Sequence, residues 1–399
     1  MKSWFFHGVN IWAASRLALP PGAAQINNDM EMTWEREMRK KVSLALALLA
    51  AGVAQAADLQ VSLGSQPAAN GKDVEVTVNY RNTGKETLHV YRWYLPSGEL
   101  QEPILQVSRD GKAVTYLGAR YKRVAPSLKD TVALPPDASL SAKVKVSEFY
   151  DLSQAGKLSV SFQADSDRVL NRGLPVGVSA KSASAAAPLN ETLRSNVLTL
   201  DSPAIGSPLL QKAKQAQSEW SVLARSAASS VSYANCSVKQ QQDAAAGIGA
   251  ASAMANESTA YLSGAPSGTP RYTTWFGKYS QANWNTAKAH FLNIKDALDA
   301  KPVSIDCGCS KPGVFAYVYP AQPYKVYLCD AYWTAPTKGT DSKGGTLVHE
   351  LSHFTVVAGT DDHVYGQSGA KNLAKTNPAQ ALNNADNHEY FAENTPGQP

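Results

Sequence analysis

The 399-residue sequence has only four cysteines, and none of them precedes position 236. The N-terminal half therefore cannot form a disulfide and offers no thiol as a ligand. Cys307 and Cys309 are separated by one residue, too close to be expected to pair with each other. Each is expected to pair outward, with Cys236 or Cys329, while the alternative is that the C-x-C pair forms half of a structural zinc site.

A basic stripe with interleaved aromatic residues is also missing, which argues against nucleic acid as a partner. The formal net charge is +5, but much of the basic excess lies in the N-terminal half. From Ser232 to the end the sequence has 13 acidic and 12 basic residues, so this part is close to neutral. The charge therefore indicates no particular class of partner.

No apolar run is long enough for a stable membrane span. Residues 1–37 have mixed charges and resemble no targeting segment, so we interpret them as a misassigned upstream extension. A basic start follows Met38, an apolar stretch runs over Val42–Val53, and small residues lead to Ala56. This pattern predicts a signal peptide over residues 38–56 and a secreted, extracellular protein.

The most informative segment is LVHELSHF, residues 347–354. His349 and His353 are four apart, which places both imidazoles on one face of a helix. Glu350 is adjacent to the first and can reach a water held by a metal there, as in the H-E-x-x-H motif of zinc peptidases. A chance match is the alternative, but burying these groups in an otherwise apolar helix without a partner would be costly.

A third protein ligand would leave one open position on the metal. Gly359 and Thr360 can end the helix and turn the chain back. The segment that follows offers three candidate side chains, namely Asp361, Asp362 and His363. Spacing does not separate the two aspartates, and a distant glutamate, Glu389 or Glu393, is the alternative.

The helix followed by GTDDHVYG resembles the aspzincins, the deuterolysin and peptidyl-Lys metalloendopeptidase family, over about the last 170 residues. Their pattern is H-E-x-x-H followed by G-T-x-D-x-x-Y-G. The resemblance implies one zinc ion per catalytic domain, held by His349, His353 and Asp362. It also implies that Glu350 is the general base and that Tyr365 donates a hydrogen bond to the oxyanion.

The segment NNADNHEYFAEN, residues 383–394, resembles the one that lines the pocket for the residue after the scissile bond in the lysine-specific branch. The resemblance implies that Asp386 and Glu389 bind substrate. Carboxylates three residues apart can face one pocket, attract an ammonium group and disfavour apolar side chains. The alternative is that both are solvated on a surface turn. The resemblance further implies the disulfides Cys236–Cys307 and Cys309–Cys329.

The remaining sequence predicts a multidomain chain. Short alternating strands with turns between them, over Asp58 to about Asp201, predict an antiparallel β-sandwich, immunoglobulin-like in outline. A helix is expected over residues 209–225, followed by an exposed hinge, SAASSVSYANCS. The C-terminal part is expected to be an α+β zincin-like domain, with helices over 238–262 and 281–300 and a hairpin within 314–333. The hairpin should form a cleft edge to which an extended peptide can add as a strand.

Processing near Ser230 to Ser232, which the resemblance implies, would leave residues 57–231 as a propeptide and 232–399 as the zinc metallopeptidase domain. The sequence thus predicts a secreted zinc metalloendopeptidase, made as a precursor, that prefers lysine after the scissile bond. Its expected partners are protein or peptide substrates and its own propeptide, and a monomer is expected. The alternatives are a toxin or effector-type metalloprotease that keeps its β-sandwich, and a non-catalytic binding protein with a degenerate site.

Overall fold

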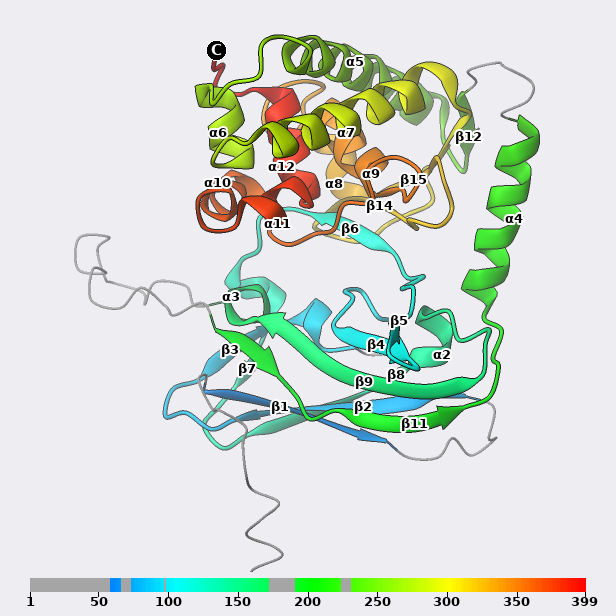
Figure 1. Ribbon diagram of the computed structural model, residues 1–399, viewed down its shortest axis with the longest axis vertical. Coiled ribbons are helices and arrows are strands. Elements are labelled where there is room, and N and C mark those ends of the chain that lie inside the picture. Colours follow the sequence, from blue (N-terminus) through cyan, green and yellow to red (C-terminus); the bar gives the residue numbers. More distant parts are fainter. Residues whose placement is uncertain (1–57, 66–72, 97, 172–190, 224–230) are drawn as a thin grey trace, which may run out of the picture. The chain divides into compact units, whose positions relative to one another are not determined.

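A computed structural model of the protein describes residues 58–65, 73–96, 98–171, 191–223 and 231–399 (Figure 1). These residues belong to one compact unit, Gln55–Pro399. The predicted upstream extension and signal peptide lie outside the described residues. Within the described part of the chain, no helix is both long enough and apolar enough to cross a membrane.

The N-terminal region consists mainly of antiparallel strands around one core. The first sheet has the order β1-β2-β8, made of Leu59–Ser65, Glu75–Asn82 and Ser139–Lys145. The second has the order β10-β9-β4-β5, with β11 also paired to β9, made of Thr192–Arg194, Gly156–Asp165, Leu105–Arg109, Lys112–Ala113 and Leu198–Ser202. A further pair joins β3 to β7, Leu88–Tyr91 and Thr131–Leu134.

The alternation of apolar and polar residues along these strands determines which face of each strand is buried. In β2 the side chains of Val76, Val78 and Tyr80 are fully buried, and those of β9 that meet them include Val160 and Phe162. Short helical segments join the strands: η2 Arg92–Tyr94, η3 Leu128–Asp130, α2 Val146–Phe149 and α3 Ser166–Val169. The antiparallel strands are as predicted, while the identification of this region as a β-sandwich propeptide stays a prediction.

The segment that joins the two regions differs from the predicted hinge. Helix α4, Pro208–Leu223, is close to its predicted range. Residues 226–230 of the hinge lie outside the described residues, but Val231–Ala234 forms strand β12. This strand pairs in parallel with β13, Val303–Asp306, so Ser232 is exposed as predicted but lies in the edge strand of a sheet and not in a loop. Backbone hydrogen bonding to β13 therefore fixes the part of the hinge that carries Val231 and Ser232.

The C-terminal region is built on a sheet of order β12-β13-β15-β14-β6. Strands β14, Val314–Val318, and β15, Lys325–Leu328, form the predicted hairpin. The outer strand β6, Arg120–Arg123, comes from the N-terminal region and runs antiparallel to β14. The edge to which the sequence predicts that a peptide can add is thus occupied by another part of the same chain.

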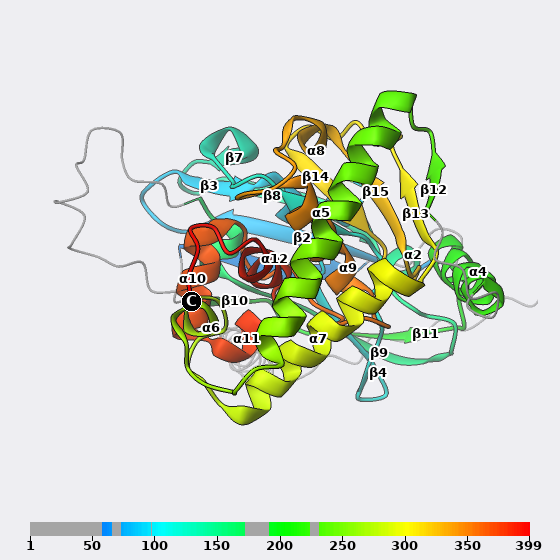
Figure 2. The ribbon, with the colours of Figure 1, turned by 90° about the horizontal axis from the view of Figure 1, so that it is seen from above.

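Helices cover this sheet and carry most of the candidate residues (Figure 2). They are α5 Val238–Leu262, α6 Pro270–Phe276, α7 Gln281–Ala300, α8 Asp330–Thr334, α9 Lys343–His353, α10 Gly366–Thr376, α11 Pro378–Leu382 and α12 Ala385–Glu393. Helix α5 begins at a capping box between Ser237 and Gln240. On α7, the predicted apolar face buries Trp284, Phe291 and Ile294 in the core.

Two disulfides close the chain around the sheet. Cys236 is bonded to Cys307, and Cys309 is bonded to Cys329. This is the pairing that the resemblance implies. All four sulfurs are used, so no free thiol is left for the alternative structural zinc site.

Helix α9 approaches its neighbours closely because its first turn contains two glycines. A Cβ atom at Gly344 would lie 2.8 Å from the Cβ of Ala250 and 3.1 Å from the backbone nitrogen of Ala251, both on α5. A Cβ atom at Gly345 would lie 2.1 Å from a carboxylate oxygen of Glu393 on α12. The glycines therefore allow α9 to lie directly against α5 and α12.

Gly344→Ala is expected to lower the free energy of unfolding by about 1–3 kcal/mol, because the added methyl group meets backbone atoms of α5. Gly249→Ala, at an exposed position of α5 with open space around it, serves as the control. That change should be neutral or stabilising by up to about 1 kcal/mol, since alanine is the better helix former. Denaturant titration of both variants measures the difference, and equal stabilities would contradict this account of the contact.

Candidate metal centre

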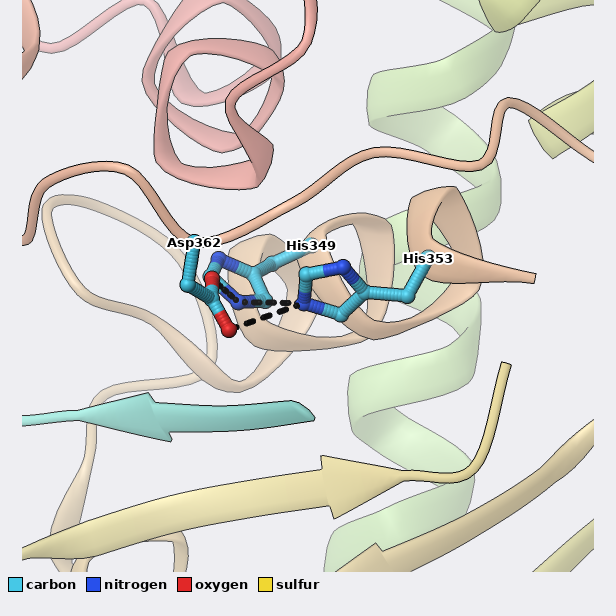
Figure 3. A group of neighbouring side chains, drawn as sticks. All are labelled: His349, His353 and Asp362. Carbon is cyan, nitrogen blue, oxygen red and sulfur yellow. Dashed lines mark hydrogen bonds and ion pairs between the residues drawn. The ribbon is translucent and has the colours of Figure 1, made fainter. Parts of the chain in front are cut away.

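The two histidines of the motif lie one turn apart on α9, as predicted, and both are completely buried. Their rings face each other through their outer nitrogens, with 3.1 Å between the Nε2 atoms of His349 and His353 (Figure 3). Asp362 faces the same point. Its Oδ1 lies 3.2 Å from His349 Nε2 and its Oδ2 lies 3.4 Å from His353 Nε2.

The chain reaches Asp362 by a tighter path than the sequence predicts. Helix α9 ends at His353, so the expectation that Gly359 and Thr360 end the helix is wrong. A turn follows instead, in which the Gly359 nitrogen donates to the carbonyl of Phe354 and Gly359 has a φ of 62°. Glycine adopts this conformation without strain. The Thr360 nitrogen then donates to Ser352, which brings the next residues back beside the helix.

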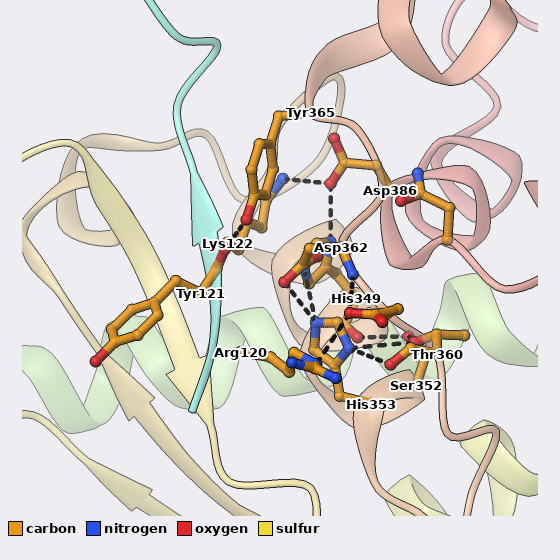
Figure 4. A network of polar contacts seen from close by, with 12 residues as sticks. Arg120, Tyr121, Lys122, His349, Ser352, His353, Thr360, Asp362, Tyr365 and Asp386 are labelled. Atoms are coloured by element: carbon orange, nitrogen blue, oxygen red, sulfur yellow. Dashed lines mark hydrogen bonds and ion pairs between the residues drawn. The ribbon is translucent and has the colours of Figure 1, made fainter. Parts of the chain in front are cut away.

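The inner ring nitrogens of both histidines are also engaged. His349 Nδ1 lies 2.8 Å from Asp386 Oδ1, and His353 Nδ1 lies 2.9 Å from the carbonyl oxygen of Thr360 (Figure 4). A carbonyl oxygen only accepts, so His353 Nδ1 is the donor and its Nε2 keeps a free lone pair. Such contacts are typical of metal-ligating histidines, because they fix the tautomer and the orientation of the ring.

Charge and burial support the same interpretation. Burial by itself would raise the pKa of Asp362, but the neighbouring His353 and His349 outweigh it and hold the pKa well below its usual range. Neither carboxylate oxygen of Asp362 accepts a hydrogen bond within the described residues. Two imidazole nitrogens and an ionised carboxylate, buried and facing one point, are the donor set that zinc takes in proteins. The residues present therefore fit a bound zinc ion.

The other candidate ligands lie elsewhere. Asp361 forms an ion pair with Arg120, with 3.1 Å between Oδ1 and Nε. The ring of His363 contacts the Asn383 side chain. Glu393 caps the start of α9, where it accepts hydrogen bonds of 2.8 Å from the nitrogen and the hydroxyl of Ser342. Glu389 faces His349 from its Nδ1 side, at 3.4 Å, so it is not placed beside the facing Nε2 atoms.

Glu350, the acidic residue of the motif, has no hydrogen-bond partner for its carboxylate among the described residues. Its side chain is completely buried, and neither of its oxygens accepts a hydrogen bond within the part of the chain that the structure describes. Burial raises the pKa of its carboxyl to about 8, although the nearby His349 acts in the opposite direction. A carboxyl that titrates close to neutral pH is suited to accept and return a proton.

Tyr365 lies at the N-terminal end of α10, with its hydroxyl directed towards β6. The hydroxyl oxygen lies 2.9 Å from the backbone oxygen of Tyr121 and 3.1 Å from Glu102 Oε1, and its single hydrogen can be donated to one of these acceptors at a time. It is therefore placed to donate to a peptide carbonyl, because it contacts one in this structure.

The two predicted pocket carboxylates lie on α12 and are buried, so the alternative that they are solvated on a surface turn is wrong. Both face the ammonium group of Lys122 on β6, which lies 2.6 Å from Glu389 Oε2 and 3.7 Å from Asp386 Oδ1. Asp386 has a further contact that the sequence does not predict, namely the one to His349. This residue therefore connects the pocket to the candidate metal ligands.

A third carboxylate, from Asp341, lies 3.6 Å from the Lys122 nitrogen. The Tyr390 hydroxyl fixes it with a hydrogen bond of 2.6 Å. Nothing in the motif indicates Asp341, because it precedes α9 and reaches the pocket only when α12 packs beside that helix. Its position immediately before the helix-capping Ser342 is the only local signal.

A second group of potential ligands adjoins the first and consists of His349, Asp386 and Glu389. The Lys122 ammonium group already lies against both of its carboxylates. His349 directs Nε2 towards His353 and Asp362 and directs Nδ1 towards Asp386 and Glu389. A metal on the Nε2 side and the Lys122 ammonium group on the Nδ1 side can therefore occupy opposite sides of the same ring.

Comparison with known proteins identifies the family. Residues 261–393 match the model of the aspzincin family, described as lysine-specific metallo-endopeptidase. The chain is 46% identical to an extracellular protease of Aeromonas hydrophila over 328 residues, which are 82% of this chain and 89% of the relative. It is 33% identical to a peptidyl-Lys metalloendopeptidase of Grifola frondosa over 377 residues, 90% of this chain and all of the relative.

Two shorter proteins are also similar. A peptidyl-Lys metalloendopeptidase of Pleurotus ostreatus is 49% identical over 164 residues, which are 41% of this chain and 97% of the relative. A solved zinc peptidase from Grifola frondosa is 48% identical, with a TM-score of 0.39, and the match covers 41% of this chain and 100% of the solved chain.

We expect one equivalent of zinc on the facing Nε2 atoms. His353→Ala and Asp362→Asn should each weaken zinc binding by at least about 100-fold, because the first removes a ligand and the second removes the negative charge of another. Glu350→Gln should keep the metal, because this side chain has no place among the three donors. Metal analysis after dialysis against a weak chelator measures the content. Retention of zinc by His353→Ala, or its loss in Glu350→Gln, would contradict the assignment.

Proposed function

The chain belongs to the aspzincin family of zinc metalloendopeptidases, and from this premise we propose that it is a secreted enzyme, made as a precursor, that cuts peptide bonds before lysine. The observation that carries the proposal is the pairing of two features on opposite sides of His349. One is the group His349, His353 and Asp362 with the adjacent Glu350, whose carboxylate accepts no hydrogen bond from the described residues. The other is a carboxylate pocket that holds a lysine ammonium group.

In the proposed mechanism, His349, His353 and Asp362 hold the metal. A zinc ion in that place supplies Lewis-acid activation of a water and of the scissile carbonyl. Glu350 accepts the proton of the attacking water and returns it to the leaving amine. Its carboxylate, which accepts no hydrogen bond within the described residues, and its pKa of about 8 suit this role. The Tyr365 hydroxyl donates a hydrogen bond to the developing oxyanion. Support for this last role is its contact with the carbonyl of Tyr121.

Asp386 acts in this scheme as a positioning residue as well as a pocket residue. It accepts from the Gly366 nitrogen at 2.6 Å while it contacts His349 Nδ1. A hydrogen bond to that nitrogen keeps the imidazole in the tautomer that leaves Nε2 free. A change of Asp386 would therefore disturb metal binding and specificity together.

The pocket favours lysine for electrostatic and steric reasons. Asp386 and Glu389 are buried, and buried negative charges are tolerable only beside a cation. The compact ammonium group on its flexible stem reaches between the carboxylates, whereas the planar guanidinium of arginine is wider and presents its donors in a fixed fork. An apolar side chain would leave the carboxylates desolvated and unpaired.

The precursor proposal assigns residues 57–231 to a β-sandwich propeptide with its linker and helix, and residues 232–399 to the peptidase. The Pleurotus ostreatus relative supports this division, because nearly its whole length corresponds to less than half of this chain. Both disulfides also lie beyond residue 231. Export is supported by these disulfides, which persist outside the cytoplasm, and by the Aeromonas hydrophila relative, which is named an extracellular protease.

Digestion of a denatured protein by the active form tests the proposal. New N-termini, identified by mass spectrometry, should be strongly enriched in lysine. Glu350→Gln should lose about 10²–10⁴-fold in kcat/KM while it retains zinc, because the proton acceptor is gone. Random new N-termini would refute the specificity, and full activity of Glu350→Gln would refute the mechanism.

Asp341 gives a cleaner test of the pocket, since it contacts the ammonium group and no candidate metal ligand. Because its side chain is 43% exposed, Asp341→Asn is expected to lower kcat/KM for lysine substrates only about two- to five-fold, with zinc content unchanged. Asp330→Asn, at an exposed position of α8, is the matched control and should leave both quantities unchanged. Equal effects of the two substitutions would remove Asp341 from the pocket.

A further inference from the structure

Strand β6 lies along the cleft edge of the catalytic sheet, where the side chains of Arg120 and Lys122 reach residues of the candidate site. Arg120 pairs with Val318 of β14, Tyr121 with Tyr317 and Lys122 with Ala316. The ring of Tyr121 also lies 5.1 Å from that of Tyr317, measured between centroids. The N-terminal region is thus joined to the peptidase sheet through backbone and side-chain contacts at the place where substrate would bind.

Lys122 is completely buried, which is unusual for a lysine and requires compensation. Its nitrogen meets the carboxylates of Glu389, Asp341 and Asp386 at 2.6, 3.6 and 3.7 Å. The ring of Phe315 lies 4.9 Å from the same nitrogen and provides an aromatic face. The pocket proposed to hold a substrate lysine therefore already contains one from the same chain.

The backbone around Lys122 also matches a substrate cut before lysine. The carbonyl that would be attacked in such a substrate belongs to the residue before the lysine, which here is Tyr121. That carbonyl oxygen accepts the hydrogen bond of 2.9 Å from Tyr365 (Figure 4). The strand runs antiparallel to β14, as an added peptide strand can. Side chain, carbonyl and strand pairing therefore agree on a single register, in which the Tyr121–Lys122 bond corresponds to the bond that is cut in a substrate.

Further contacts hold the strand in this register from both sides. Arg120, before the bond, forms its ion pair with Asp361, next to the candidate ligand Asp362. Arg168 on α3 donates to the backbone oxygen of Asp362 itself. Beyond the bond, the Val124 nitrogen donates to the carbonyl oxygen of Gly313, just before β14, at 3.0 Å. The two sides of the bond are thus anchored independently of the pocket.

We propose that β6 is an inhibitory strand that occupies the cleft as a substrate does, with Lys122 as the residue that fills the lysine pocket. This inference rests on the proposed function, and it adds the means by which the precursor is kept silent. Because β6 is tethered to the peptidase, its effective concentration is far above that of a free substrate, which therefore competes poorly. Anchors on both sides would also keep the strand in place if the bond between them were cut.

The test compares full-length precursors that carry Lys122→Ala or Lys143→Ala with the wild type. Lys143 is an exposed lysine of β8 in the same region, paired with Glu75, and serves as the matched control. Initial rates are measured on a fluorogenic peptide with lysine after the scissile bond, while mass spectrometry verifies that each precursor is intact. Uncut Lys122→Ala should be at least about ten-fold faster than the wild type, and Lys143→Ala should equal it.

A second arm applies if Lys122→Ala does not fold, as judged by circular dichroism. A synthetic peptide of residues 117–126 is added to the processed wild-type enzyme, beside the same peptide carrying Lys122→Ala. The first should compete with the fluorogenic substrate at least about ten-fold better than the second. Equal competition, or an intact and folded Lys122→Ala precursor as slow as the wild type, would overturn the inference. If processed wild type fails to cut before lysine at all, the proposed function has failed instead.

Discussion

Burial of several like charges in one small volume is the constraint on which the site depends. Asp362, Asp386 and Glu389 lie completely or almost completely buried around His349. Negative charges in such a place are stable only beside cations or hydrogen-bond donors. One cation is the Lys122 ammonium group, and the facing Nε2 atoms with Asp362 offer a place for the other. His349 stands between the two and couples the pocket to the metal centre.

The residues on the two sides of His349 are held in place by the close packing of α5, α9 and α12. Helix α9 carries both histidines, and its glycines leave room for the backbone of α5 at Gly344 and for the Glu393 side chain of α12 at Gly345. Helix α12 then brings Asp386 and Glu389 to one side of His349, while the turn after α9 brings Asp362 to the other. The fold thus sets the distance between the candidate metal and the lysine pocket through direct helix contacts.

The parts of the site that are local in sequence could be predicted from it. A spacing of four residues on a helix places two imidazoles together whatever the rest of the fold does, and the three-residue spacing of Asp386 and Glu389 acts in the same way. The family pattern then separates Asp362 from Asp361, which spacing does not. The structure adds a reason, because Arg120 already pairs with Asp361.

Contacts between distant segments could not be predicted. Asp341 enters the pocket only because α12 packs beside the start of α9, and Lys122 only because β6 leaves the N-terminal region to join β14. Strand β12 shows the same limit, since it follows a run of serines and alanines that predicts a hinge, and only the pairing with β13 makes it a strand. In the N-terminal region, alternation predicts strands but gives no sign that one of them belongs to another sheet.

The same pocket is assigned two occupants in succession, first Lys122 and then a substrate lysine. Activation would therefore require release of a strand that is held by sheet pairing, by ion pairs and by a buried ammonium group. Removal of the N-terminal region would end the tethering that gives β6 its advantage over free peptides. Specificity and latency would then be consequences of one set of carboxylates.

The most direct test of this account is a crystal structure of the zinc-loaded Glu350→Gln precursor, with diffraction data collected on both sides of the zinc absorption edge. The account predicts one anomalous peak beside the Nε2 atoms of His349 and His353 and the carboxylate of Asp362, with Lys122 still in its pocket. A peak between Asp386 and Glu389 with Lys122 displaced, or no peak beside the two histidines, would contradict it.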